Sequence, residues 1–510
     1  FERGVAYRYR GEGRSSALPL PIQLQANARA NRPKKADTTH QKQEIKQGTS
    51  KMKIIVLNGS PKGEDSITLQ YVAYIRKHFP QHDFRIVHVS LRIKKIERDL
   101  EAFQEIIDEV RSADGVLWSF GLWVLCVPAQ YMRFIELISE RGVEDAFENK
   151  YAAVMTTSIH FYDHTAHNYM RAVCEDLGMK YVDAISLDII DMMKEERRQE
   201  MTVFADGFFK AIQEQPATSK LFKPLTFSHF AYQPTRPETR TDAKGKKILV
   251  LTDEYDSDTN LGKMIARFKE SFVDEIEVID LNDIDIRGAC LGCMRCGYDY
   301  TCVYKDGFAD FYNQRVRSAD IIVFAGTVRG RYLSSTWKTF YDRAYFWNHT
   351  PSLAGKQLGY IIAGPLRQNP NLTQILEASS TARQYANHVD IITDEGENSE
   401  EIDALLQSFA QRLVSFAEKG YVRPQNFLGV GGHKVFRDNI WGRLRPLWQA
   451  DYRYFKQHKL FDFPQKDYKI RALTPILMFL TKIPGVRRKY YANVKAFPSG
   501  RLTKLIEHVD

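Results

Sequence analysis

Residues 53–68, KIIVLNGSPKGEDSIT, decide the fold that we predict for this chain. The first six residues are a short apolar run of the kind that forms a buried parallel strand. The loop that follows leads into residues 66–79, whose apolar spacing is typical of a helix. Strands and helices in alternation predict a doubly wound parallel sheet. The later apolar runs of this alternation lie at residues 84–89, 115–119, 151–156 and 180–187.

The same alternation begins again after a linker, residues 216–244, in which prolines break any regular element. The first strand of the second series is expected at residues 247–251, KILVL. We therefore predict an α/β protein with two tandem domains of similar size, at residues 52–215 and 245–420. The repeat is too long for a solenoid. The later strands of the second domain are expected at residues 276–281, 321–325, 358–363 and 389–392.

Charge and hydropathy exclude several classes of protein. The chain has 510 residues and net charge +9, but residues 1–51 carry 11 basic and 4 acidic side chains, and residues 421–510 carry 18 basic and 6 acidic side chains. The part between them is therefore acidic, which argues against nucleic acid as a partner. The sequence has no run of 18 apolar residues, so no membrane-spanning helix is expected. Six cysteines are too few for a disulfide-stapled secreted protein, and we expect a cytoplasmic one.

The two ends of the chain are expected to differ from the domains between them. Residues 1–51 show no apolar periodicity, and we interpret them as a disordered tail, with a targeting peptide as the alternative. Residues 421–510 are basic and aromatic, which indicates a helical extension. Two interpretations of this extension stay open. Its helices either dock on the acidic core or make a weak contact with a membrane surface.

The loop after the first strand has the composition of a phosphate-binding loop. Two glycines let the backbone approach a ligand closely. The helix that follows directs its free N–H groups and positive dipole end toward the loop. A plain strand–helix turn, with Ser66 as the N-cap, is the alternative. The candidate cofactor-binding residues of this loop are Gly59, Ser60, Pro61, Lys62, Ser66 and Thr68.

This loop resembles the phosphate loop of the flavodoxin-like NADPH-dependent FMN reductase superfamily, with Ile67 where that family has asparagine. The resemblance continues in residues 119–130, SFGLWVLCVPAQ, and at the end of the fourth strand. It implies a sheet of order 2-1-3-4-5 and a bound FMN, on whose ring Trp123 could stack. The further candidate flavin-binding residues that it implies are Phe120, Gly121, Leu122, Trp123, Thr157 and Ser158.

The equivalent loop of the second domain, residues 252–260, reads TDEYDSDTN and lacks the Gly-Ser-Pro turn. Its four acidic side chains would repel a phosphate group, by about 1 kcal/mol or more for each close charge. If one FMN binds, we expect it in the first domain.

The second domain instead carries four cysteines with the spacing C-x2-C-x2-C-x5-C. Four thiolates in one compact loop are the ligand set of a [4Fe–4S] cluster, and neighbouring glycines give the backbone freedom to wrap around it. Two alternatives remain. Zinc prefers two separated C-x2–4-C knuckles, and disulfides are rare in a reducing compartment. The candidate metal ligands are Cys290, Cys293, Cys296 and Cys302.

Residues 290–308 resemble the iron–sulfur flavoproteins, and the resemblance extends through residues 318–343. In that family a homodimer brings the cluster of one subunit near the FMN of the other. The resemblance thus implies either a homodimer or the same arrangement within one tandem chain. It further implies an oxidoreductase that passes electrons between NAD(P)H or a ferredoxin-like donor, FMN and the cluster. A non-enzymatic electron carrier, a membrane-surface redox adaptor and a zinc-containing binding module are the alternatives.

Overall fold

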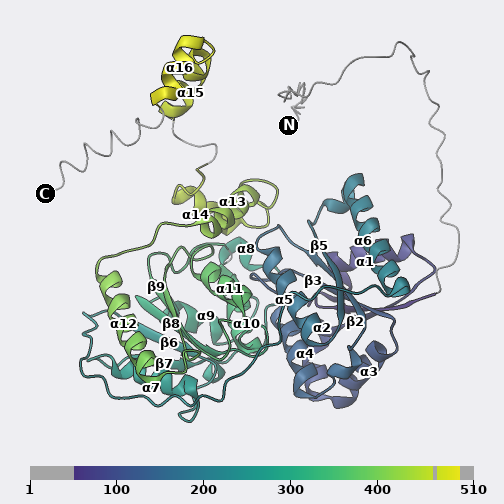
Figure 1. The fold of residues 1–510 in the computed structure, drawn as a ribbon, viewed down its shortest axis with the longest axis horizontal. Helices are drawn as coiled ribbons and strands as arrows, with labels where there is room; N and C mark the ends of the chain where they lie inside the picture. The colour runs from purple at the N-terminus through teal and green to yellow at the C-terminus, as the bar shows by residue number, and fades with distance from the viewer. Residues whose placement is uncertain (1–50, 348, 463–467, 494–510) are drawn as a thin grey trace. The chain divides into compact units, whose positions relative to one another are not determined.

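The computed structural model describes residues 51–347, 349–462 and 468–493. The tail predicted at residues 1–51 lies outside the described residues, apart from Lys51. Figure 1 shows two parallel sheets with helices around each, which confirms the predicted α/β class.

The first sheet has the predicted strand order, β2-β1-β3-β4-β5, and all of its neighbouring strands are parallel. In the centre of the sheet, Leu57 of β1 lies opposite Val87 of β2 and Trp118 of β3. The chain leaves β1 toward one edge and returns to its other side, so the carboxyl ends of β1 and β3 flank the switch point where ligands bind. The strands are β1 (Lys53–Asn58), β2 (Asp83–His88), β3 (Gly115–Gly121), β4 (Tyr151–Thr157) and β5 (Lys180–Leu187).

Alternate residues of β1 serve the two faces of this sheet. Ile54 and Val56 pack in the core with α1 (Ile67–His78) and α6 (Glu195–Glu214). Ile55 and Leu57 pack on the opposite face. The helices of that opposite face are α2 (Val89–Arg98), α3 (Leu100–Arg111), α4 (Ala129–Glu140) and α5 (Asp163–Asp176).

The second sheet repeats this topology with the order β10-β9-β8-β6-β7. Its strands are β6 (Ile248–Thr252), β7 (Glu277–Asp280), β8 (Ile321–Thr327), β9 (Gln357–Ala363) and β10 (Asn387–Thr393). Its main helices are α7 (Asn260–Glu270), α10 (Ser335–Arg343), α11 (Pro370–Ser380) and α12 (Ser399–Glu418). The short helices are η1 (Gly63–Asp65), η2 (Glu144–Ala146), η3 (Asp191–Met193), η4 (Leu281–Asp283), α8 (Cys296–Asp299), α9 (Phe308–Phe311), η5 (Tyr312–Val316) and η6 (Ala344–Trp347).

Corresponding helices of the two domains pack against each other. Helix α4 contacts α10, and α5 contacts α11. Each pair joins helices that follow equivalent strands, so the domains meet as the two halves of a symmetric dimer do. Asp342 accepts a hydrogen bond from the Ala129 backbone N–H (2.9 Å), and Arg331 forms a two-pronged ion pair with Asp176. One continuous hydrophobic cluster runs through both domains.

Part of the C-terminal extension packs on this core. Phe436, in α13 (Phe427–Trp441), stacks on Phe161 with ring centroids 4.0 Å apart. Arg443 pairs with Asp188, and α14 (Gln449–Gln457) contacts α8. Two further helices follow, α15 (Tyr468–Leu480) and α16 (Pro484–Asn493). Among the described residues, none of the helices combines the length and the apolar character that crossing a membrane requires.

Candidate functional site

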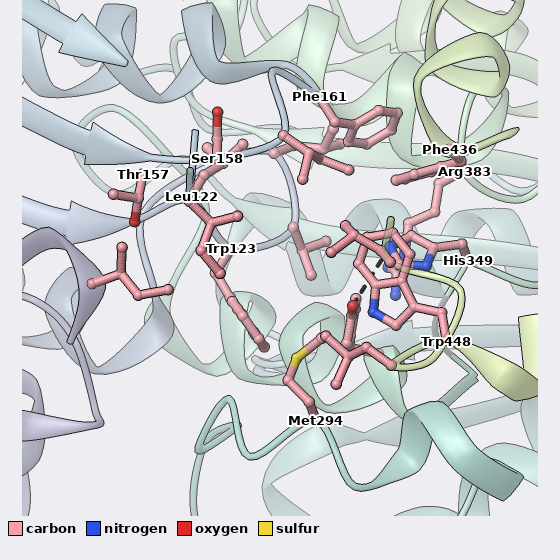
Figure 2. A pocket seen from close by; sticks show the side chains of 18 of the residues that line it. Leu122, Trp123, Thr157, Ser158, Phe161, Met294, His349, Arg383, Phe436 and Trp448 are labelled. Carbon is pink, nitrogen blue, oxygen red and sulfur yellow. Dashed lines mark hydrogen bonds between the residues drawn. The ribbon is translucent and has the colours of Figure 1, made fainter. Parts of the chain in front are cut away.

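The carboxyl ends of β1, β3 and β4 open onto a cavity of about 230 Å³, which we call the main cavity (Figure 2). Three loops that the sequence singled out supply one wall of this cavity. Lys62 comes from the loop after β1, Leu122 and Trp123 follow β3, and Thr157 and Ser158 lie at the end of β4. Residues predicted separately, from three different strands, therefore come together at one site.

The opposite wall comes from parts of the chain that the sequence did not connect with this site. Figure 2 shows Arg383, His349, Phe436 and Trp448 gathered at the end of the cavity away from Thr157. The aromatic composition of the extension was the only sequence signal for this wall, and it did not indicate where the extension packs. The lining residues from the second domain are Met294, Tyr345, His349 and Arg383, and those from the extension are Phe436, Leu444, Leu447 and Trp448.

The predicted phosphate loop lies at the N-terminus of α1. Ser66 is the N-cap residue, but its side chain makes no capping hydrogen bond. Because no side chain caps this end of α1, its N–H groups are available to an anion. Gly63 has φ +56°, and a Cβ on Gly59 would lie only 2.7 Å from the Tyr131 ring. Both positions therefore require glycine.

Several predicted site residues are not part of the lining of the main cavity. Phe120 is fully buried and packs on Tyr131, with ring centroids 5.6 Å apart. The Thr68 hydroxyl hydrogen-bonds the Thr157 hydroxyl at 2.8 Å, which ties α1 to the end of β4. These residues position the loops. The predicted residues that are not part of the lining are Gly59, Ser60, Pro61, Ser66, Thr68, Phe120 and Gly121.

Trp123 lies at the centre of the site. Its ring is 5.1 Å from the Tyr345 ring, measured between centroids, and its backbone carbonyl accepts a hydrogen bond from Lys338 Nζ at 2.9 Å. Val124 and Leu125, which follow it, have φ values of +38° and +68°. Side chains in this left-handed region are strained, and such strain is concentrated at functional sites. The second domain thus holds a strained loop of the first in place.

Lys338 and Asp342 of α10 form an ion pair, and both side chains are completely buried. Asp342 also accepts the Ala129 hydrogen bond described above. Burial raises the pKa of Asp342 to about 6, although the Lys338 charge acts in the opposite direction. The pair therefore connects α10 to two positions of the first domain, Ala129 and Trp123.

The four cysteines line a second, smaller cavity of about 20 Å³, the cysteine cavity. Gly292 and Met294, within the cysteine loop, have φ values of +64° and +60°, which curl the backbone. The Cys290 carbonyl accepts a hydrogen bond from Gln130 Nε2 of the first domain at 2.9 Å. Trp123, Met294 and Tyr345 border both cavities.

The cysteine loop also touches the predicted phosphate loop. A Cβ on Gly292 would lie 3.2 Å from Lys62 Cε and 3.5 Å from Cη2 of Trp123. The cysteine loop of the second domain and the predicted phosphate loop of the first domain are therefore in contact.

The ionisation of the thiols reflects how closely they are grouped. Burial raises the pKa of Cys290 to about 12, and the nearby Cys293 and Cys302 add to this effect. Burial and the same neighbours also raise the pKa of Cys296. In the described part of the chain, no group of three or more His, Cys, Asp or Glu side chains is arranged to hold a metal ion. The structure therefore shows a common cavity for the four thiols and assigns no metal to it.

The equivalent loop of the second domain is occupied by its own carboxylates. Ser334 donates a hydrogen bond to Asp253, and burial raises the pKa of Asp253. Glu254 accepts hydrogen bonds from the Thr327 hydroxyl at 3.3 Å and from Arg329 at 3.2 Å. At this end of β6, the hydrogen-bond donors that could bind a phosphate group are therefore already bonded to carboxylates.

The first domain has a doubly wound sheet, and its cavity opens at the carboxyl ends of β1, β3 and β4. These two features define the domain as flavodoxin-like. Residues 52–189 match the family model described as NADPH-dependent FMN reductase. This match confirms the resemblance seen in the sequence of the first domain. No curated protein matches the chain.

Solved structures similar to this chain include NADH:FMN oxidoreductase in its apo form, with 17% identity and a TM-score of 0.28, covering 33% of this chain and 95% of that one. The FerB NAD(P)H:acceptor oxidoreductase from Paracoccus denitrificans has 17% identity and a TM-score of 0.27, covering 32% and 98%. An FMN-dependent NADH-azoreductase from Bacillus anthracis has 14% identity and a TM-score of 0.23, covering 32% and 99%.

Proposed function

We propose that this chain is an oxidoreductase that binds FMN in its first domain and a [4Fe–4S] cluster in its second. It would pass electrons between NAD(P)H or a ferredoxin-like donor, the flavin and the cluster. The observation that carries this proposal is the wall shared by the two cavities, which consists of Trp123, Met294 and Tyr345. A flavin exchanges two electrons as a hydride or one at a time, and an iron–sulfur cluster exchanges one at a time.

The residues of the main cavity fit FMN. The uncapped N-terminus of α1 and the nearby Lys62 suit the phosphate group. Leu122 and Trp123 offer apolar and aromatic contacts for a flat ring, and the Thr157 and Ser158 side chains offer hydroxyl groups to its polar edge. The family match over residues 52–189 supports the choice of FMN. The acidic loop of the second domain leads us to propose one flavin per chain.

The donor set of the cysteine cavity fits an iron–sulfur cluster. The four cysteines line one cavity, and four thiolates are the ligands that such a cluster uses. Burial raises the pKa of Cys290 to about 12, and the positive charge of a bound metal would favour its thiolate form. Because these thiols must stay reduced, we propose a cytoplasmic location. The tandem domains pair within one chain, so the proposed site does not require the homodimer implied by the resemblance.

One anaerobic purification tests the proposal. We expect an absorbance spectrum with flavin and cluster bands, about one FMN and four iron atoms per chain, and NAD(P)H oxidation in the presence of an acceptor. The Cys290→Ser variant should lose iron and keep FMN. Cys174→Ala is the matched control, because Cys174 is a buried cysteine of α5 outside the cysteine cavity.

Other outcomes would identify the alternatives. Bound zinc without iron would indicate a binding module. Flavin and iron without NAD(P)H oxidation by any acceptor would indicate an electron carrier. Colourless, iron-free protein would refute the proposal.

A further inference from the structure

Arg383 lies just after α11 and contributes to the far wall of the main cavity. Its side chain is buried, with 5% of the residue exposed. Among the described residues, no carboxylate forms an ion pair with this guanidinium, and its buried Nη2 has no hydrogen-bond partner. A buried charge without a partner is costly, so buried charges are normally paired.

Other buried arginines of this chain are paired. Arg331 bonds Asp176, and Arg343 bonds Asp306 with both of its terminal nitrogens. Arg383 differs from them because it borders the main cavity. Its missing partner is therefore expected to be a ligand.

The surroundings of Arg383 define the chemistry of that ligand. Asp342, whose negative charge acts on Arg383, is already paired with Lys338. Asp451 is completely buried and bonds the Nδ1 atom of His349 at 2.9 Å. The His349 ring lies between aromatic rings, with its centroid 4.2 Å from that of Phe436 and 4.1 Å from that of Trp448. This end of the cavity thus offers one positive charge that has no ion-pair partner among the described residues and lies near aromatic side chains.

We propose that Arg383 binds the anionic group of the substrate that shares the main cavity with the flavin, and that this substrate is an aromatic monocarboxylate. That this ligand is a substrate rests on the proposed function of the chain as an oxidoreductase. A carboxylate matches the planar guanidinium, which can donate two parallel hydrogen bonds. One charge neutralises one guanidinium, whereas a phosphate dianion would leave a negative charge among the rings. The aromatic body of the ligand would pack on Phe436 and Trp448.

The test measures binding of 2-naphthoate to the full chain by calorimetry, with and without FMN. The uncharged 2-naphthamide is the matched ligand. We expect Arg383→Gln to weaken naphthoate binding by about 10- to 100-fold, the range of a hydrogen bond to a charged group, and to leave naphthamide binding unchanged. Arg412→Gln is the control variant, because Arg412 pairs with Asp390 away from the cavity.

A stability measurement separates this role from a structural one. If Arg383 awaits a ligand, removal of its unpaired charge in Arg383→Met should leave the urea midpoint of the ligand-free chain unchanged or raise it. A lowered midpoint would mean that Arg383 supports the fold, and would overturn the proposal. Equal affinity for naphthoate and naphthamide would overturn it as well. So would an Arg383→Gln variant that loses FMN and keeps naphthoate. A chain that binds naphthoate through Arg383 but no FMN would refute the proposed function and leave the anion site standing.

A separate observation concerns α15. Its apolar side chains Leu473, Ile476, Leu477 and Leu480 are exposed, and their spacing places them on one face of the helix. Residues 468–493 contain six basic and no acidic side chains, three of them at 487–489 in α16. An exposed apolar face of this kind requires a covering surface.

We infer that α15 and α16 bind the surface of an anionic lipid bilayer. An apolar helix face enters the boundary between headgroups and acyl chains, and nearby basic residues add attraction to anionic headgroups. The six basic and no acidic side chains of residues 468–493 match an anionic surface, and the exposed apolar side chains of α15 match the acyl layer beneath the headgroups of a bilayer.

Co-sedimentation with vesicles tests this inference. The full chain should sediment with vesicles containing phosphatidylglycerol and much less with phosphatidylcholine alone. The Leu477→Asp variant should lose binding, and the double variant Arg487→Gln/Arg488→Gln should bind about 30-fold more weakly, at about 1 kcal/mol per charge. Val203→Asp, at an exposed apolar position of α6, is the control. Unchanged vesicle binding by Leu477→Asp would overturn the inference, and so would a loss of self-association without any effect on lipid binding.

Discussion

Replacement of Lys338 by methionine should destabilise the folded chain by about 3–5 kcal/mol and weaken the binding of FMN. Lys338 is completely buried, pairs with the equally buried Asp342, and donates a hydrogen bond to the Trp123 carbonyl. Methionine fills a similar volume, so the variant removes the charge and leaves packing nearly intact. The variant leaves the buried Asp342 carboxylate without its ion-pair partner and the Trp123 carbonyl without its hydrogen bond.

The magnitude follows from the burial of both partners. Loss of one partner of a buried ion pair costs about 3–5 kcal/mol, because the other charge stays in a poorly solvated position. Replacement of both partners by apolar side chains is often neutral, because no charge is left behind. The Lys338→Met/Asp342→Leu double variant should therefore be at least 2 kcal/mol more stable than Lys338→Met. Release of the Trp123 carbonyl should also loosen the flavin-binding loop, which weakens FMN binding.

Urea unfolding followed by tryptophan fluorescence gives the stability, and a fluorescence titration gives the affinity for FMN. Lys150→Met is the matched control, because Lys150 also donates to backbone carbonyls, those of Arg111 and Ala113, but strands no buried carboxylate. The control should lose about 1 kcal/mol and keep its affinity for FMN. A loss below 1 kcal/mol in Lys338→Met, or a double variant less stable than the single one, would refute this account of the domain interface.

Three further predictions concern the two cavities and the pH dependence of stability. Cys302→Ser should reduce iron from about four atoms per chain to less than one by elemental analysis, whereas iron retained at the level of the unchanged chain would remove Cys302 from the ligand set. Lys62→Gln should raise the dissociation constant of FMN by about 3- to 5-fold, because an exposed lysine contributes about 1 kcal/mol or less, and unchanged titrations at low salt would contradict a phosphate contact. The pKa of Asp342, about 6, lies above that of a free carboxyl group, so the folded chain holds this proton more tightly than the unfolded chain. The stability that this adds is complete below pH 4 and is lost between pH 4 and 6, by about 3 kcal/mol. The difference in unfolding free energy between the unchanged chain and Asp342→Asn should follow this pH profile, and a flat difference would show that Asp342 does not titrate there.

Apolar runs were sufficient to predict both sheets, because parallel strands are buried on two faces and their sequences stand out. Helix α2, residues 89–98, was missed because it begins at Val89, directly after β2, with no glycine or proline between them. The same absence of a break placed Val89 in the predicted strand.

Of the candidate site, only the wall formed by the loops of the first domain could be predicted from the sequence. The loops after β1, β3 and β4 belong to one domain, and their order along the chain gives their positions at one edge of the sheet. Arg383, His349 and Trp448 reach the main cavity through packing between domains and with the extension. Such contacts join residues that are far apart in the sequence, and no periodicity in a single sequence encodes them.

The back-to-back packing of α4 on α10 has a kinetic consequence for this chain. When two separate subunits must associate to complete a site, dilution dissociates them and subunits exchange between dimers. Here the partner is covalently attached, so assembly is a first-order process and proceeds equally well at nanomolar and millimolar protein. Because each lobe is encoded once, a substitution in the first lobe is not copied into the second. The two halves are therefore free to differ at equivalent positions, as the Gly-Ser-Pro turn after β1 and the acidic loop after β6 do.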